Sequence, residues 1–154
     1  MLLPITDSLV VQSDEALRLL RFQWVTLSRQ PIRPAFARGR DLVVQFQPTR
    51  VLVDFTGLPS IGIADEIWLA RHWLPVLLRQ SLQQAALVFK SQLHLHNLHN
   101  QIALEALLWA GRRHMNLQFQ VFDDAESALD WLTDSQEAAR ELQAEWLNSA
   151  PVVR

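Results

Sequence analysis

Asp54, Ser60 and His72 are the residues whose types and positions could support acid–base or nucleophilic chemistry. Asp54 ends the apolar run VLVD, and the carboxyl ends of buried strands often carry functional carboxylates. Ser60 follows in a loop that contains glycine and proline, but no G-x-S-x-G elbow surrounds it. Because the spacing assigns no base to any nucleophile, we expect no enzymatic activity. We expect Asp54 to accept hydrogen bonds from the loop backbone instead.

Three histidines, His94, His96 and His99, form a cluster that could bind a metal. In an extended segment, His94 and His96 would point to one side, a spacing that metal sites use. No carboxylate stands beside them, however, and Asn97 or Asn100 can begin a helix. The cluster therefore predicts a polar loop between a strand and a helix, and we expect no metal.

Composition excludes several further kinds of site. The chain has no cysteine, which removes disulfides, thiol catalysis and cysteine-bound zinc. It has four glycines and none of the glycine-rich motifs that cradle phosphates, so we expect no nucleotide cofactor. Arg29, Arg33, Arg38 and Arg40 cluster in the sequence, but the net charge of −2 and the absence of tyrosine argue against a nucleic-acid partner.

The length of 154 residues suits one domain, and a hydrophobic content of 49% can supply a dense core. The first residues, MLLPITDSLVV, lack the basic region of a signal peptide. No apolar stretch approaches the ~20 residues of a transmembrane helix. We therefore expect a cytoplasmic protein.

The elements that must position these side chains alternate between strand-like and helix-like patterns. Two apolar runs around a polar turn predict an antiparallel hairpin, and later continuous apolar runs predict buried parallel strands. The last strand alternates apolar and polar residues, which predicts either one solvent-exposed face or a position at the sheet edge. Strands are expected at 8–12, 17–26, 50–56, 85–89 and 116–122, and helices at 31–46, 63–79, 102–110, 128–132 and 135–148. The fold class is α/β: one domain whose mixed sheet has an N-terminal hairpin followed by parallel βα units.

The segment 63–79 is the most distinctive predicted helix because it is apolar on two sides. One stripe is the expected core face and consists of Ile63, Ile67, Ala70, Leu74 and Leu77. A second stripe consists of Leu69, Trp73 and Val76. Pro75 lacks the N–H that would bond to the Arg71 carbonyl, which predicts a kink near Arg71.

The second apolar stripe, Leu69, Trp73 and Val76, needs a partner that shields it from water. A neighbouring helix, an apolar ligand or another protein molecule would each serve, and the sequence leaves these open. Tryptophan is common at interface anchors, and Trp68 falls outside both stripes. The interface or ligand candidates are therefore Trp68, Leu69, Trp73 and Val76.

The segment around Asp54 resembles the central segment of STAS domains, the fold of bacterial anti-sigma-factor antagonists. It consists of a hydrophobic strand, Asp54, a short loop and a helix that begins at Gly62–Asp65. The closing FDDAESALDWL, residues 122–132, resembles the ending of a bacterial STAS-like branch related to the CRAL-TRIO lipid-exchange fold. A tryptophan in the 63–79 helix and a W-x-P motif also recur in that branch, and they resemble Trp68 and Trp73-Leu74-Pro75 here. The resemblance covers roughly residues 8–133.

STAS switch proteins place a phosphorylatable serine or threonine at the start of this helix. Aligned on Asp54 and Ile61, the present chain has Gly62, Ile63, Ala64 and Asp65 there, so it has no hydroxyl at the switch position. Ser60 is the nearest hydroxyl, and Asp65 would supply a permanent negative charge. We therefore expect no phosphoswitch.

The resemblance implies a STAS-like domain over 1–133 with a C-terminal helical extension over 134–154. It implies a non-enzymatic regulatory or scaffold module that binds a protein partner or forms a homodimer. The alternative is a carrier for a lipid or other apolar small molecule, in a cavity lined by residues such as Leu69, Trp73, Val76 and Trp109.

Overall fold

The computed structural model describes residues 1–3, 9–24, 32–89, 95–112 and 116–149. Within them, strands and helices follow in the predicted order. The strands are β1 (Leu9–Asp14), β2 (Leu19–Trp24), β3 (Arg50–Asp54), β4 (Gln84–Val88) and β5 (Gln118–Phe122). The helical elements are α1 (Ile32–Phe46), α2 (Ile63–Trp68), η1 (Leu69–Trp73), α3 (Leu74–Leu78), α4 (Leu95–Arg112), α5 (Ala125–Thr133) and α6 (Gln136–Ser149). Residues 8, 25, 26 and 31 of the predicted elements lie outside the described residues.

The described strands form one sheet in the order β1-β2-β3-β4-β5. β1 and β2 pair antiparallel, with Leu9 opposite Trp24, and β2 through β5 pair parallel. The predicted mixed sheet with an N-terminal hairpin is confirmed, and the last strand lies at the sheet edge, one of the two arrangements predicted for it.

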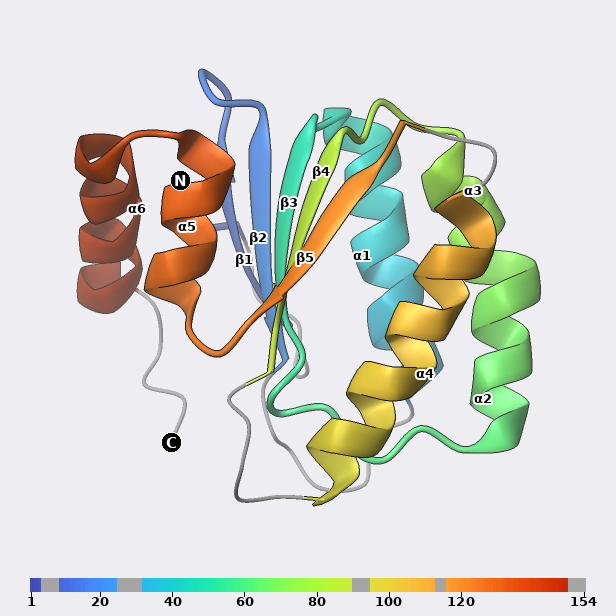
Figure 1. Cartoon of the computed structure of the whole chain (residues 1–154). Helices are drawn as coiled ribbons and strands as arrows, with labels where there is room; N and C mark the ends of the chain where they lie inside the picture. Colours follow the sequence, from blue (N-terminus) through green and yellow to red (C-terminus); the bar gives the residue numbers. More distant parts are fainter. Residues whose placement is uncertain (4–8, 25–31, 90–94, 113–115, 150–154) are drawn as a thin grey trace.

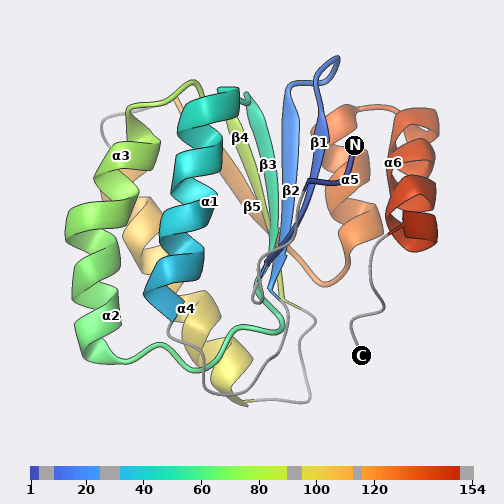
Figure 2. The same cartoon turned by 180° about the vertical axis from the view of Figure 1, so that it is seen from behind.

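The order of the strands decides which face each helix covers. Because β2 to β5 advance in one direction and crossovers between parallel strands are right-handed, all the connecting helices must lie on the same face. Figures 1 and 2 show α1, α2, α3 and α4 on one side of the sheet and α5 and α6 on the other. The C-terminal helices therefore cover a face that the βα units leave open.

Aromatic rings fill the space between the sheet and α1. Trp24 lies 4.5 Å from Phe36 and 5.6 Å from Phe55, measured between ring centroids, and Phe55 continues the stack to Phe89 at 5.3 Å. These side chains come from β2, α1 and the ends of β3 and β4. They fix α1 against the strands that carry the loop after Asp54.

The predicted helix 63–79 is interrupted by the π-helical turn η1. The N–H of Leu74 donates to the carbonyl of Leu69, five residues back, directly before Pro75. The extra residue in this turn places Leu69 and Leu74 on the same face. The predicted core stripe is therefore half wrong: Leu74 and Leu77 are buried, whereas Ile63, Ile67 and Ala70 are exposed.

Helix α4 also differs from the prediction because it begins at Leu95 rather than at Ile102. From Leu95 onward the His/Asn-rich segment is helical rather than a loop, and neither Asn97 nor Asn100 is the residue before the helix. Asn100 lies inside the helix and is fully buried. Its contacts, described below, explain why a segment of weak helix formers is helical here.

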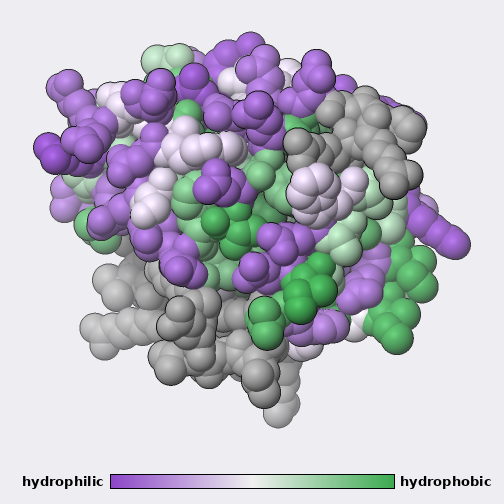
Figure 3. All heavy atoms as spheres, in the orientation of Figure 1, coloured by the Kyte–Doolittle hydropathy of each residue, from purple (hydrophilic) through white to green (hydrophobic). Residues whose placement is uncertain are grey.

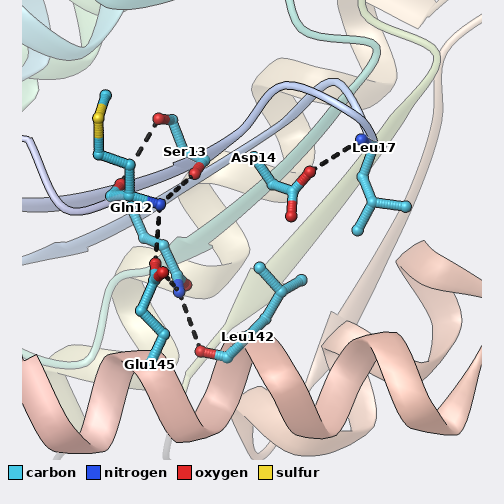
Figure 4. A network of polar contacts seen from close by, with 7 residues as sticks. Gln12, Ser13, Asp14, Leu17, Leu142 and Glu145 are labelled. Atoms are coloured by element: carbon cyan, nitrogen blue, oxygen red, sulfur yellow. Dashed lines mark hydrogen bonds and ion pairs between the residues drawn. The ribbon is translucent and has the colours of Figure 1, made fainter.

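Helix α6 is joined to the β1 edge by polar contacts (Figure 4). Gln12 is fully buried, and its amide donates to the Leu142 carbonyl at 2.9 Å and to Glu145 at 2.9 Å. The Met1 ammonium donates to Glu145 at 2.8 Å and to the Ser13 carbonyl at 2.6 Å. The Met1 ammonium and the Gln12 amide both donate to Glu145 and lower the pKa of its carboxyl group. The contacts with Leu142 and Glu145 of α6 tie residues 130 or more apart in sequence.

Arg21 is a buried cation beneath the same helix. Its guanidinium lies 3.9 Å from the ring centroid of Trp146 and donates to Gln143 at 2.8 Å. Burial lowers the pKa of Arg21 to about 10, and the negative charge of Asp54 opposes this shift. α6 thus covers a polar part of the sheet with an aromatic ring and polar side chains, although Oε1 of Gln12 and Nε of Arg21 have no hydrogen-bond partner among the described residues.

Candidate binding surface at the β3–α2 loop and helix α4

Asp54 has a structural contact in the loop that follows β3. Its side chain is buried, and Oδ1 accepts a hydrogen bond from the backbone N–H of Thr56 at 2.9 Å. The Phe55 N–H donates to the Val88 carbonyl, so the loop leaves the sheet at a defined point. The prediction that Asp54 accepts a hydrogen bond from the loop backbone is confirmed.

Asn100 holds the other end of this loop. Its Oδ1 accepts from the Ile61 N–H at 2.9 Å, and its Nδ2 donates to the carbonyls of Pro59 at 3.0 Å and Leu58 at 3.4 Å. His99 Nε2 adds a contact of 3.1 Å to the Ile61 carbonyl and lies 3.6 Å from Glu66 Oε1. The first turns of α4 therefore determine the path of the chain into α2.

We call these contacts of Asn100 and His99 with residues 58–61 the clamp. The clamp was not predicted from the sequence. The two signals for it were present: a polar Asn at helical spacing from Leu104, and a loop whose backbone groups need partners. Only the fold shows that the Asn100 side chain bonds the backbone of this loop, because the residues are 39 to 42 positions apart in sequence.

Ser60 and Asp65 lie on either side of the clamped residue Ile61. Ser60 is exposed in the loop. Asp65, in the first turn of α2, forms a 2.7 Å ion pair with Nε of Arg33 from α1. The Arg33 guanidinium also lies 5.9 Å from the ring centroid of Trp68. The Asp65 charge is therefore partly neutralised by α1.

The four interface or ligand candidates have different surroundings. Leu69 is fully buried in the core, so it cannot contact a partner and its choice as an interface residue was wrong. Trp73 is half-buried against α1: its Nε1 donates to the Phe36 carbonyl at 3.0 Å, and the two rings meet edge to face at 5.0 Å. Trp68 and Val76 are also half-buried. A neighbouring helix, α1, thus covers the second stripe at Trp73.

A different set of apolar side chains is exposed beside the clamped loop. Ile63 and Ile67 of α2 are 78% and 48% exposed, and Leu98 and Ile102 of α4 are 55% and 59% exposed. We call these four residues the α2–α4 surface. The contacts of His99 and Asn100 with the 61–66 segment bring the two helices together there. In Figure 3, separate hydrophobic patches with hydrophilic atoms between them appear at the lower right, where Figure 1 draws these helices.

An apolar cavity of about 70 Å³ lies between the sheet and helices α1, α3 and α4. Phe22, Phe36, Phe55, Trp73 and Leu104 are among its lining residues, and Gly39 opens onto it. Typical ligand sites measure roughly 300–1,000 Å³. A carrier for a lipid would therefore need these helices to move apart. Of the lining residues expected for a carrier, only Trp73 borders the cavity.

We expect Gly39→Ala to raise the free energy of unfolding by about 1 kcal/mol, because glycine inside a helix is unfavourable by that amount. A Cβ atom at Gly39 would lie 3.8 Å from Cε1 of Phe22, an ordinary contact that also fills part of the cavity. Urea denaturation followed by tryptophan fluorescence measures the change. A loss of stability would show that the close approach of α1 to β2 requires glycine.

The remaining sequence candidates are placed as follows. His94 and the side chain of His96 lie outside the described part of the structure. Across the described part of the chain, no group of three or more His, Cys, Asp or Glu residues is arranged to hold a metal ion. Among the helices described, none has the length and hydrophobicity needed to cross a membrane.

Comparisons with known proteins give no relative from which a role could be transferred. The chain matches no family model, no curated protein and no solved structure.

Proposed function

We propose that this protein is a non-enzymatic, STAS-like regulatory or scaffold module that binds another protein through the α2–α4 surface. The single observation behind the proposal is the exposure of four large aliphatic side chains on adjoining helices beside a clamped loop. Contiguous exposed apolar side chains mark interaction sites in soluble domains. The resemblance to STAS domains adds that STAS switch proteins carry their phosphorylatable residue at the start of this same helix.

The surface is supported by polar contacts with the rest of the fold. The loop is held by Asn100, and the start of α2 is held by the Arg33–Asp65 pair. A preorganised surface loses little conformational freedom on binding. Ile63, Ile67, Leu98 and Ile102 would enter an apolar groove of the partner, while Glu66 and His99 would lie between them as polar contacts.

The test compares Ile67→Asp with Leu147→Asp in cross-linking and affinity capture from the host. Ile67 and Leu147 are both exposed, but Leu147 lies on α6, on the opposite face of the sheet. We expect a protein captured by the wild type to be retained by Leu147→Asp and reduced at least about tenfold by Ile67→Asp, the loss typical of one interface anchor.

Both variants should keep the wild-type melting temperature, because exposed substitutions change stability by about 0.5 kcal/mol or less. Capture that is equal for the two variants, or cross-links that map to α5 and α6, would refute the assigned surface.

A further inference from the structure

The two edges of the sheet differ in whether other described residues cover them. The outer side of β1 is covered by the first residues: the Leu3 N–H donates to the Val11 carbonyl at 2.9 Å, and the Ser13 N–H donates to the Met1 carbonyl at 2.7 Å. Within the described residues, β5 pairs only with β4. β5 is the strand nearest the viewer in Figure 1 and the farthest in Figure 2.

The backbone groups at the open edge can be identified from the contacts of β5 with β4. The Gln118 N–H donates to the Gln83 carbonyl, and the Phe122 carbonyl accepts from the Phe89 N–H. Backbone groups alternate in direction along a strand, so Gln118, Gln120 and Phe122 point theirs toward β4. The N–H and C=O groups of Phe119 and Val121 therefore point outward.

The edge lacks the features that usually prevent strands from pairing between molecules. Its sequence, QFQVF, contains no charge and no proline. Aromatic side chains flank it on both faces: Trp109 of α4, which is 56% exposed, meets Phe119 at 5.3 Å, and Trp131 of α5 meets Phe122 at 5.7 Å. Figure 3 views the molecule from this side and shows hydrophobic atoms at its centre, with hydrophilic atoms around them.

We propose that β5 pairs antiparallel with β5 of a second copy of this chain, about a two-fold axis at Gln120. In this register Phe119 lies opposite Val121 of the second copy, and these are the residues whose backbone groups point outward. Each of the two equivalent pairs exchanges two hydrogen bonds, so four backbone bonds join the sheets.

The strand is complementary to itself in this register. Phe119 and Val121 face each other on the side of α4, and the two Gln120 amides meet at the axis on the side of α5. The acidic residues after the strand, Asp123 and Asp124, lie opposite Leu117 and Asn116 rather than opposite each other. In this register no like charges lie opposite each other, and each residue of the strand has a compatible partner in the second copy. This self-complementarity favours a second copy over an arbitrary extended segment as the partner of β5.

Charge substitutions at Gln120 test the axis directly. Gln120 is exposed, so Gln120→Lys and Gln120→Glu leave the monomer fold unchanged, which circular dichroism and the melting temperature verify. In the dimer each places two like charges opposite each other, and we expect the dissociation constant to rise at least about tenfold. An equimolar mixture of the two variants brings lysine opposite glutamate and restores a dimer, as a mixed species in native mass spectrometry.

Sedimentation velocity at roughly 1–200 µM, the range expected for an interface of modest area, gives the wild-type state. A wild-type dimer that both variants weaken and their mixture restores supports the axis. A wild-type chain that stays monomeric, a Gln120→Lys chain that stays dimeric, or a mixture that stays monomeric overturns it. Ile67→Asp leaves the dimer intact, so failure here is separate from failure of the α2–α4 surface.

Discussion

Replacing Asn100 by alanine is expected to lower the free energy of unfolding by about 2–4 kcal/mol, the sum of an unpaired buried donor and a small void. The side chain is fully buried and bonds the backbone of Leu58, Pro59 and Ile61. Ile61 is itself buried, so water does not readily replace the lost acceptor for its N–H. Urea denaturation at pH 7, read by tryptophan fluorescence, measures the loss.

Two variants separate the clamp from general damage to α4. Asn100→Asp has the same size and still accepts from the Ile61 N–H, but its carboxylate cannot donate to the Pro59 carbonyl. We expect it to be destabilised as well, because a buried carboxylate then faces carbonyl oxygens. His99→Ala, whose side chain is largely exposed, is expected to lose about 1 kcal/mol or less. Equal losses for His99→Ala and Asn100→Ala would contradict this account.

The same change has a consequence for the proposed binding surface. Releasing the 58–61 loop frees the start of α2, which carries Ile63 and Ile67. Hydrogen exchange at the α2 amides should therefore increase in Asn100→Ala more than exchange in β3. A uniform increase would indicate global destabilisation without a local effect on the loop.

The parts of the fold that follow from local chemistry could be predicted from the sequence. Asp124 illustrates this: its position before the α5 segment predicts a helix start, and in the structure it accepts from the Ser127 N–H at 2.7 Å. The alternating QFQVF pattern of β5 predicts a strand with one solvent-exposed face or at the sheet edge, because one period-2 face is polar.

The phase of the helix after β3 could not be predicted. A helical wheel assumes 100° per residue throughout, but η1 adds one residue to the turn before Pro75. This shift exposes Ile63 and Ile67 while Leu69 and Leu74 enter the core. The predicted interface was therefore placed on Leu69 and Trp73, one side away from the residues that are exposed.

The polar residues between the sheet and α6 were also beyond sequence reasoning. Gln12 and Arg21 occupy positions that alternate with core residues of β1 and β2, which predicts solvent exposure for a two-layered fold. They are buried because α5 and α6 return over that face, where the apolar residues Val10 and Leu19 are buried as well. The candidate site has the same limit, since Asn100 and Ile61 meet only through the tertiary fold.

Trp146→Ala is expected to lower the free energy of unfolding by about 3–5 kcal/mol, as for other buried tryptophans. Trp146 is 6% exposed, and its ring covers the guanidinium of Arg21. Removal leaves a void and exposes a buried cation to a poorly solvated space. The neighbouring residue provides a matched control: Leu147 is 69% exposed, and Leu147→Ala should change stability by about 0.5 kcal/mol or less.

A double-mutant cycle isolates the contact between Trp146 and Arg21. Arg21→Met keeps an unbranched side chain of similar length and removes the charge whose desolvation lowers the pKa of Arg21 to about 10. We expect a loss of similar size to that for Trp146→Ala, because Arg21→Met removes a positive charge that acts on the buried carboxylate of Asp54.

The double variant should be more stable than the sum of the single losses predicts by about 1–2 kcal/mol, the size of a desolvated cation–π contact. A coupling near zero would mean that the indole stabilises α6 through apolar packing alone, with Gln143 as the group that holds Arg21. A coupling of the expected size would show that α6 is fixed to the sheet through the cation that it covers.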